Sequence, residues 1–222
     1  MNLLSTRGTA AQQSMAAKGR IPTALLWLAV ALAGFLVLLI VGAMLYALPA
    51  TLSLPRGPRP GVEKLTLEAA TVRLRTSGLE GWQLVEAARR LVGERMAYCR
   101  RNSFDSYRKA FRRGYGYCQQ QAYALRHLLR ALGFEADVVQ ALRNRFPDGE
   151  VSGHAWVRVV YRGQSRDVDP RHQDPEDGSL QFDSLSPVTR MAFAFRLFSG
   201  WGCTAANAYR YYRTGSDTAG GY

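Results

Sequence analysis

Three residues in the second half of the chain carry side chains that could act together in covalent catalysis: Cys118, His154 and Asp169. A thiolate can attack a carbonyl carbon, and an imidazole can take and return the thiol proton near neutral pH. A carboxylate can fix the tautomer and orientation of that imidazole. A single cysteine is more often an inert buried thiol, so the catalytic interpretation depends on whether the fold brings the three residues together.

A helix is predicted to begin at or just before Cys118. Apolar residues recur after it at three- and four-residue steps: Ala122, Leu125, Leu128, Leu129 and Leu132. This is the stripe of an amphipathic helix, and Gly133 supplies a C-terminal stop. A thiol at a helix N-terminus, with Arg112 and Arg113 close in sequence, is expected to favour the thiolate form.

A β-hairpin is predicted for residues 154–169. Residues 154–161 are rich in β-branched and aromatic side chains, residues 162–164 form a tight reversal, and residues 165–169 return antiparallel. Pairing of the two strands would bring His154 close to Asp169. Residues 134–142 predict a further strand, which a turn at 144–152 connects to the hairpin.

The motifs around these residues resemble a known family. Gly-Tyr-Cys-Gln-Gln-Gln-Ala at 116–122, Leu-Gly-Phe-Glu-Ala at 132–136, Gly-His-Ala-Trp-Val at 153–157 and Asp-Val-Asp-Pro at 167–170 occur in the order of the transglutaminase-like fold of papain-type cysteine enzymes. The resemblance covers roughly residues 80–172. It implies an α+β domain in which a central helix carrying the cysteine packs on an antiparallel sheet, with Cys118, His154 and Asp169 as the catalytic triad.

The chain departs from the family pattern in two ways. The family often has a tryptophan shortly before the triad acid, and residues 164–166 are Gln-Ser-Arg here. The side chain that would stabilise the oxyanion is not identified by a motif. The backbone N–H of Cys118 is one expected donor, and Trp82, Tyr98 and Gln119 are candidates for the other. Gly114 and Gly116 are expected to let the backbone approach the substrate carbonyl.

A membrane-spanning helix is predicted for residues 23–48, which contain no charged residue. A helix of this length would measure roughly 39 Å, enough to cross a hydrocarbon core with some tilt. Trp27 and Tyr46 fall near its two ends, where aromatic rings prefer the headgroup region. A cleaved signal peptide is the competing interpretation, but its apolar core would be roughly 7 to 15 residues and would end at a small-residue site.

The charges that flank this segment indicate its orientation. Lys18 and Arg20 lie closer to it than Arg56, Arg59 and Lys64 do on the other side. The nearer positive charges predict that residues 1–22 form a cytoplasmic tail and that the domain is extracytoplasmic. Residues 49–62 are rich in proline and predict an extended linker between the membrane and the domain.

The domain is expected to occupy residues 63–200. A weak alternation over residues 65–74 predicts an initial strand, and Ser77 with Glu80 predicts a capping box for a helix that buries Trp82. Residues 201–222 are aromatic and rich in glycine, and we expect them to form a peripheral tail.

The composition limits the possible partners and cofactors. The net charge of +12 suits an anionic surface such as membrane lipid or an acidic polymer, but no motif of a nucleic-acid-binding fold is present, and we expect no nucleic acid partner. Cys118, His127, His154 and His172 lack the close ligand pairs of zinc sites, so neither a metal nor another cofactor is expected. Of the three cysteines, Cys99 and Cys203 could pair and leave Cys118 free.

These observations predict a membrane-anchored, single-pass cysteine enzyme. It would act on the amide carbonyl of a peptide or protein through a thioester intermediate. That thioester would pass to water in hydrolysis or to an amine in acyl transfer, and we favour hydrolysis. The alternative from another class is a non-catalytic transglutaminase-like scaffold that binds a peptide or protein partner at the membrane.

Overall fold

The computed structural model of the protein describes residues 22–54, 57–102, 104–174 and 176–217, and for residues 193–199 it describes the backbone alone. The chain divides into two units, Met1–Val41 and Gly42–Tyr222. The predicted cytoplasmic tail lies outside the described residues except for Pro22.

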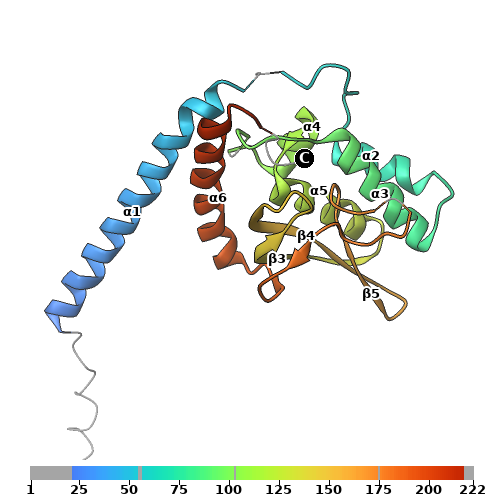
Figure 1. Cartoon of the computed structure of the whole chain (residues 1–222). Helices are drawn as coiled ribbons and strands as arrows, with labels where there is room; N and C mark the ends of the chain where they lie inside the picture. Colours follow the sequence, from blue (N-terminus) through green and yellow to red (C-terminus); the bar gives the residue numbers. More distant parts are fainter. Residues whose placement is uncertain (1–21, 55–56, 103, 175, 218–222) are drawn as a thin grey trace, which may run out of the picture. The chain divides into compact units, whose positions relative to one another are not determined.

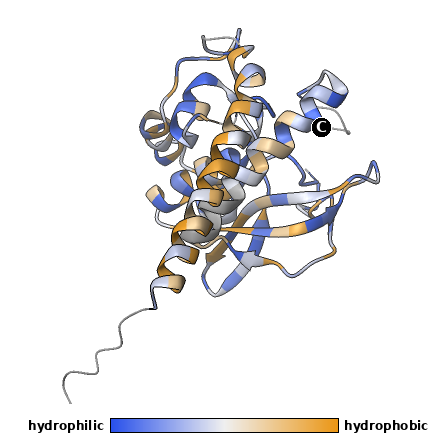
Figure 2. Ribbon diagram, turned by 90° about the vertical axis from the view of Figure 1, so that its left-hand side faces the viewer, coloured by the Kyte–Doolittle hydropathy of each residue, from blue (hydrophilic) through white to orange (hydrophobic). Residues whose placement is uncertain are grey.

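Helix α1 (Thr23–Leu52) is the long apolar helix that the sequence predicts. Figure 2 shows its ribbon coloured as hydrophobic along most of its length. Thirty residues give about 45 Å of helix, which is long enough to cross a membrane. The predicted end at residue 48 was too early, because the helix continues past Pro49 to Leu52.

Helix α2 (Leu67–Arg75) replaces the strand predicted for residues 65–74. The Thr66 side chain accepts a hydrogen bond from the Ala69 N–H at 3.2 Å and so caps the first turn. Leu67, Ala70 and Leu74 are buried at helical spacing. The apolar residues that suggested a strand also fit the three- and four-residue period of a helix. Burial of the helical face against the core favours the helix.

Helix α3 (Gly81–Arg95) follows, but its cap is not the predicted one. Glu80 is the N-cap and makes no capping side-chain hydrogen bond. The Ser77 hydroxyl instead donates to the Leu74 carbonyl at 2.7 Å and accepts from the Leu79 N–H at 3.3 Å. Ser77 therefore belongs to the end of α2, and the capping-box prediction was wrong.

Helix α4 (Tyr107–Arg113) and a small parallel sheet lie just before the cysteine. Strands β1 (Ala97–Tyr98) and β2 (Tyr115–Gly116) pair, with Tyr98 opposite Gly116. Gly114 ends α4 in the left-handed conformation at a φ of 80°, which glycine adopts without the steric cost of a Cβ. Gly114 therefore has a structural role here as a helix terminator.

Helix α5 (Cys118–Ala131) is the central helix that the sequence predicts. Its residues Leu125, Leu128 and Leu129 are fully buried in the same core as Val157 and Val159 of the sheet. Figure 1 shows α5 behind strands β3 and β4. Burial of this apolar stripe holds the helix, and with it Cys118, on the sheet.

The main sheet is antiparallel and runs in the order β5-β4-β3-β6, with β7 also pairing with β3. Its strands are β3 (Glu135–Arg145), β4 (Val151–Tyr161), β5 (Gln164–Val168), β6 (Asp183–Ser184) and β7 (Thr189–Arg190). The predicted hairpin is present, with Tyr161 opposite Gln164. Strand β4 begins three residues before His154, so the predicted turn at 144–152 is shorter than expected.

Helix α6 (Phe193–Thr214) forms most of the C-terminal region. It crosses the boundary that we placed between residues 200 and 201, and Ala208 on it is 2% exposed. Residues 201–214 are therefore not the peripheral tail that their glycine content suggested. Glycine lowers helix propensity, but packing against the domain outweighs that cost.

Candidate active site

Cys118 is the first residue of α5, and the glutamines that follow it anchor the surrounding backbone. The Gln120 Oε1 accepts from the Tyr117 N–H at 3.1 Å, which satisfies a donor just outside the helix. The Gln120 Nε2 donates to the carbonyls of Asn102 and Asp105 at 2.8 and 2.7 Å. Gln121 reaches the Met96 carbonyl at 2.7 Å. These bonds fix the helix start against the preceding loops.

Gly116 is required by packing in the same region. A Cβ built on it would lie 2.5 Å from the Met96 Cε and 3.2 Å from the Gln120 Oε1. Because glycine has no Cβ, the Gln120 side chain can reach back to the Tyr117 N–H. Gly116 thus makes room for protein side chains around the cysteine, whereas the sequence suggested room for a substrate.

A β-bulge in the sheet accompanies His154. His154 pairs with Ala141, and the next pair on that side joins Ser152 to Asn144, so two residues of β3 face one residue of β4. The fully buried Asn144 side chain donates to the carbonyls of Ala141 and Ser152 at 3.0 and 3.3 Å. Bulges change the direction of side chains and are common next to active sites. Asn144 thereby stabilises the irregular backbone beside His154.

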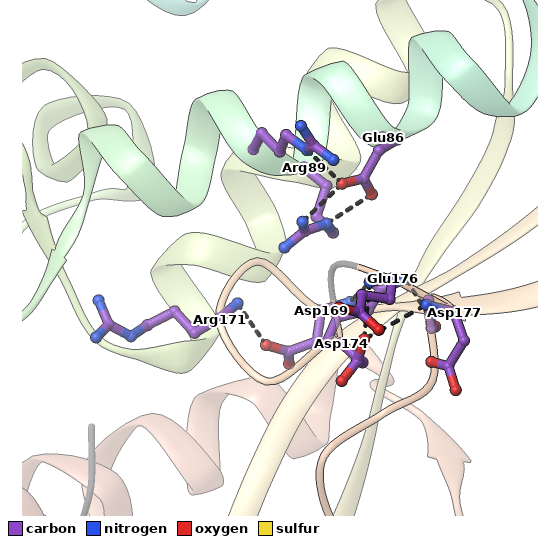
Figure 3. A network of polar contacts seen from close by, with 10 residues as sticks. Glu86, Arg89, Asp169, Arg171, Asp174, Glu176 and Asp177 are labelled. Atoms are coloured by element: carbon purple, nitrogen blue, oxygen red, sulfur yellow. Dashed lines mark hydrogen bonds and ion pairs between the residues drawn. The ribbon is translucent and has the colours of Figure 1, made fainter.

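Asp169 follows the end of β5 in a tightly bonded loop. One carboxylate oxygen, Oδ1, accepts from the backbone N–H groups of Arg171 and His172 at 2.8 and 2.7 Å. Gln173 accepts from the Asp169 N–H at 3.0 Å and donates to the Gly178 carbonyl at 2.9 Å. Figure 3 shows the carboxylate facing the Arg171 backbone, with the Arg171 guanidinium pointing away. The other oxygen, Oδ2, is left to face His154.

His154 and Asp169 form a buried pair. The His154 Nε2 lies 2.6 Å from the Asp169 Oδ2, and the two residues are 6% and 1% exposed. Burial alone would lower the pKa of His154, but the charge of Asp169 and the hydrogen bond to it outweigh burial and raise that pKa. Burial alone would raise the pKa of Asp169, and His154 reverses this and lowers it. The pair therefore favours imidazolium and carboxylate.

Cys118 lies close to the same imidazole. Its thiol contributes, after Asp169, to the raised pKa of the histidine. Because Asp169 occupies Nε2, Nδ1 is the ring nitrogen left for the thiol. The structure thus brings together all three residues that the sequence singles out, with the imidazole between the sulfur and the carboxylate.

His172 belongs to the same cluster, and the sequence motifs assigned it no role there. Its ring lies edge-on to His154 at 5.3 Å between centroids and 5.0 Å from the ring of Phe146. Burial lowers the pKa of His172 to about 4, so the ring is neutral at neutral pH. The position of His172 three residues after Asp169 is the feature of the sequence that could have indicated this, because a turn there brings the two residues together.

The three cysteines are free thiols, so the suggested Cys99–Cys203 pair is absent. Cys203 on α6 instead accepts a long hydrogen bond from the Gln119 Nε2 at 3.5 Å. Burial raises the pKa of both Cys99 and Cys203 to about 12, and charge on Cys118 adds to the shift of Cys203. Cys203 therefore lies close to the candidate nucleophile.

The remaining candidates lie in different surroundings. Trp82 stacks against Arg166, at 4.4 Å, and lines a cavity of about 620 Å³ between α3, β5 and residues 173–174 and 176–180. Tyr98 is buried one strand away from Gly116, with the Arg171 guanidinium 6.0 Å from its ring. Arg113 is paired with Asp105 at 2.5 Å. Among the described residues, no group of three His, Cys, Asp or Glu side chains could hold a metal ion.

Comparison with known proteins identifies the class. The model of the transglutaminase-like superfamily matches residues 69–170, which include all three residues of the cluster. These residues therefore have the transglutaminase-like fold, as the motifs predicted.

A solved structure is similar over part of the chain: the crystal structure of the periplasmic domain of TgpA from Pseudomonas aeruginosa bound to ethylmercury. The identity is 24% and the TM-score is 0.38, and the match covers 54% of this chain and 46% of that one. The chain thus matches less than half of the length of the TgpA structure. No curated protein matches the chain.

Proposed function

We propose that this protein is a membrane-anchored cysteine enzyme that attacks an amide carbonyl of a peptide or protein through Cys118. The observation that carries the proposal is the position of the His154 ring, which lies 2.6 Å from the Asp169 carboxylate and close enough to Cys118 for the thiol to influence its pKa. The match to the transglutaminase-like superfamily supports the same reaction class.

The reaction begins when the Cys118 sulfur forms a bond to the carbonyl carbon. The carbonyl oxygen gains the negative charge, and the backbone N–H of Cys118 at the start of α5 is a donor that can stabilise it. The C–N bond then breaks, and the amine leaves with a proton from His154. Asp169 holds the ring in orientation and stabilises its charged form throughout.

The thioester that remains has two possible acceptors. His154, now neutral, takes a proton from water or from an amine, which attacks the thioester carbon while the C–S bond breaks. Water yields a carboxylic acid, and an amine yields a new amide. In both cases Cys118 is regenerated. We favour hydrolysis of a peptide or amide.

Replacement of Cys118 tests the proposal. Cys118→Ala and Cys118→Ser are expected to lower amide hydrolysis by at least about a thousandfold, because both remove the thiol nucleophile. Turnover would be measured on a fluorogenic peptide library with the full-length protein in detergent. Undiminished activity in Cys118→Ala would show that another group performs the reaction.

A non-catalytic scaffold is the second candidate, and the low exposure of the site favours keeping it. Cys118 is 9% exposed and Asp169 only 1%. A thiol-reactive amide probe distinguishes the two functions. If the protein is an enzyme, Cys118 should be labelled faster in the wild type than in His154→Gln, because the histidine activates the thiol. If the protein is a scaffold, Cys118 should be labelled equally slowly in both.

A further inference from the structure

One face of α6 lies against the candidate active site. Cys203 contacts Gln119, the residue after the candidate nucleophile, at 3.5 Å. Thr204, Asn207 and Ala208 on the same face are 6%, 7% and 2% exposed. Two of these three buried side chains are polar. A helix that only completes a core would bury mainly apolar side chains, so this contact resembles one that can open.

Ion pairs hold the C-terminal end of α6 and the residues just after it. The Asp217 carboxylate accepts from the Arg101 side chain at 2.9 and 2.7 Å and from the Arg101 N–H at 3.2 Å. Arg210 pairs with Glu150 at 3.1 Å, and Glu150 also lies 3.7 Å from the buried Arg100. The helix is therefore held by charges at two points, and such contacts can be broken without exposing a large apolar surface.

The same end of α6 contacts the end of α1. The Tyr212 hydroxyl accepts from the Ala50 N–H at 3.2 Å and donates to the Tyr46 carbonyl at 2.9 Å. These two groups are four residues apart and would bond each other in a regular helix. A side chain inserted in this way bends a helix, and Pro49 next to it removes a further donor. Movement of the end of α1 would therefore act directly on α6.

We propose that α6 is an autoinhibitory cover over the Cys118 site, and that Tyr212 couples its position to the C-terminal end of α1. In the covered state Cys203 and its neighbours would block the approach of an extended substrate to the sulfur. Displacement of α6 opens the site. The inference rests on the proposed function, because it concerns access to the same thiol.

Native-state alkylation of Cys118 tests the cover. The full-length protein in detergent is treated with iodoacetamide, and the rate at Cys118 is read by mass spectrometry of its peptide, with Cys99 followed in parallel. Asp217→Asn and Arg210→Gln remove the two charge contacts. Each is expected to raise the Cys118 rate about fivefold, of the order that one partly buried ion pair contributes. Tyr212→Phe is expected to raise the rate as well.

Matched controls separate the cover from general loosening. Glu135→Gln and Arg145→Gln remove exposed charges on β3, and Tyr209→Phe changes an exposed tyrosine on α6 itself. None of the three should change the Cys118 rate. In Arg210→Gln and Tyr212→Phe, the buried Cys99 should stay protected and the thermal midpoint should stay within a few degrees.

The outcomes distinguish this inference from the proposed function. Equal Cys118 rates in the wild type and all contact variants would overturn the cover, even if Cys118 proves to be the nucleophile. Faster labelling of Cys118 and Cys99 together in Arg210→Gln would also overturn it, since that indicates unfolding. Retained amide hydrolysis in Cys118→Ala would overturn the catalytic role whatever the labelling shows.

Discussion

A few short hydrogen bonds stabilise the charge of the buried His154–Asp169 pair. Asp169 accepts two backbone N–H groups on one oxygen and the His154 ring on the other. A buried carboxylate costs free energy unless it is paired and hydrogen-bonded. The turn after β5 supplies these bonds and leaves one oxygen for the imidazole. The charge that orients His154 is therefore stabilised before any substrate binds.

His172 gives the first prediction at this scale, which concerns stability and pH. Its pKa is about 4 in the folded protein and about 6.5 in an unfolded chain. The unfolded state binds more protons between these values. The stability that neutral His172 contributes is therefore full above about pH 6.5 and is lost as the pH falls towards 4, by up to ~3 kcal/mol.

His172→Phe is the matching variant, because it keeps an aromatic ring beside Phe146 and the backbone N–H that bonds Asp169. Urea unfolding at pH 6.5 and pH 4.5 should show a smaller loss of stability in the variant than in the wild type. Parallel losses in the two proteins would contradict the assignment, because the other titrating groups are shared.

The candidate site depends on close contact between two elements, α3 and the loop that carries Asp169. A Cβ on Gly93 of α3 would lie 2.2 Å from the Pro170 carbonyl oxygen, so glycine alone allows the observed approach. Pro170 directly follows Asp169. The packing of α3 against Pro170 therefore helps to fix the position of the Asp169 carboxylate relative to His154.

Gly93→Ala is expected to lower the free energy of unfolding by about 2 kcal/mol, since the backbone must move to relieve the overlap. It should also lower the activity, because the shift displaces Asp169. Denaturant unfolding and peptide turnover would measure the two effects. Gly202→Ala on α6 is the control: its Cβ would meet nothing within 4 Å, and better helix propensity should leave stability equal or slightly higher. Equal stability of the two variants would refute the tight contact.

The described part of the chain combines a transglutaminase-like domain with one helix of membrane-spanning length and composition. Helix α1 exposes large apolar side chains along its length, among them Leu28, Leu32, Phe35 and Leu39. Exposed apolar surface of this extent is stable in lipid and costly in water. This exposed apolar surface is what the proposed membrane anchor requires.

Membrane extraction tests the anchor. The full-length protein is expected to stay in the membrane pellet after an alkaline carbonate wash. Leu36→Arg combined with Leu39→Arg places two charges near the middle of α1, at a cost of roughly 2.5–3.5 kcal/mol each. This variant should move to the soluble fraction. Wild-type protein in the soluble fraction would rule out a spanning helix.

Much of the candidate site was predictable because its determinants are local. The apolar period after Cys118 required a helix that begins there, and the short Arg162–Gly163 reversal required a hairpin that places His154 near Asp169. Local signals failed where two periods overlapped. The residues of α2 fit a weak alternation as well as a helix, and Ser77 could cap either of two neighbouring helices.

The sequence by itself determined the elements that carry Cys118, His154 and Asp169 and the apolar helix α1, since side-chain periodicity and turn residues specify them over short spans. Only the tertiary structure decided that α6 lies beside Cys118, that Cys203 contacts Gln119, and that Tyr212 bonds the end of α1. These contacts join residues far apart in the chain. Burial and hydrogen bonding across such distances follow from the assembled core, which local patterns do not specify.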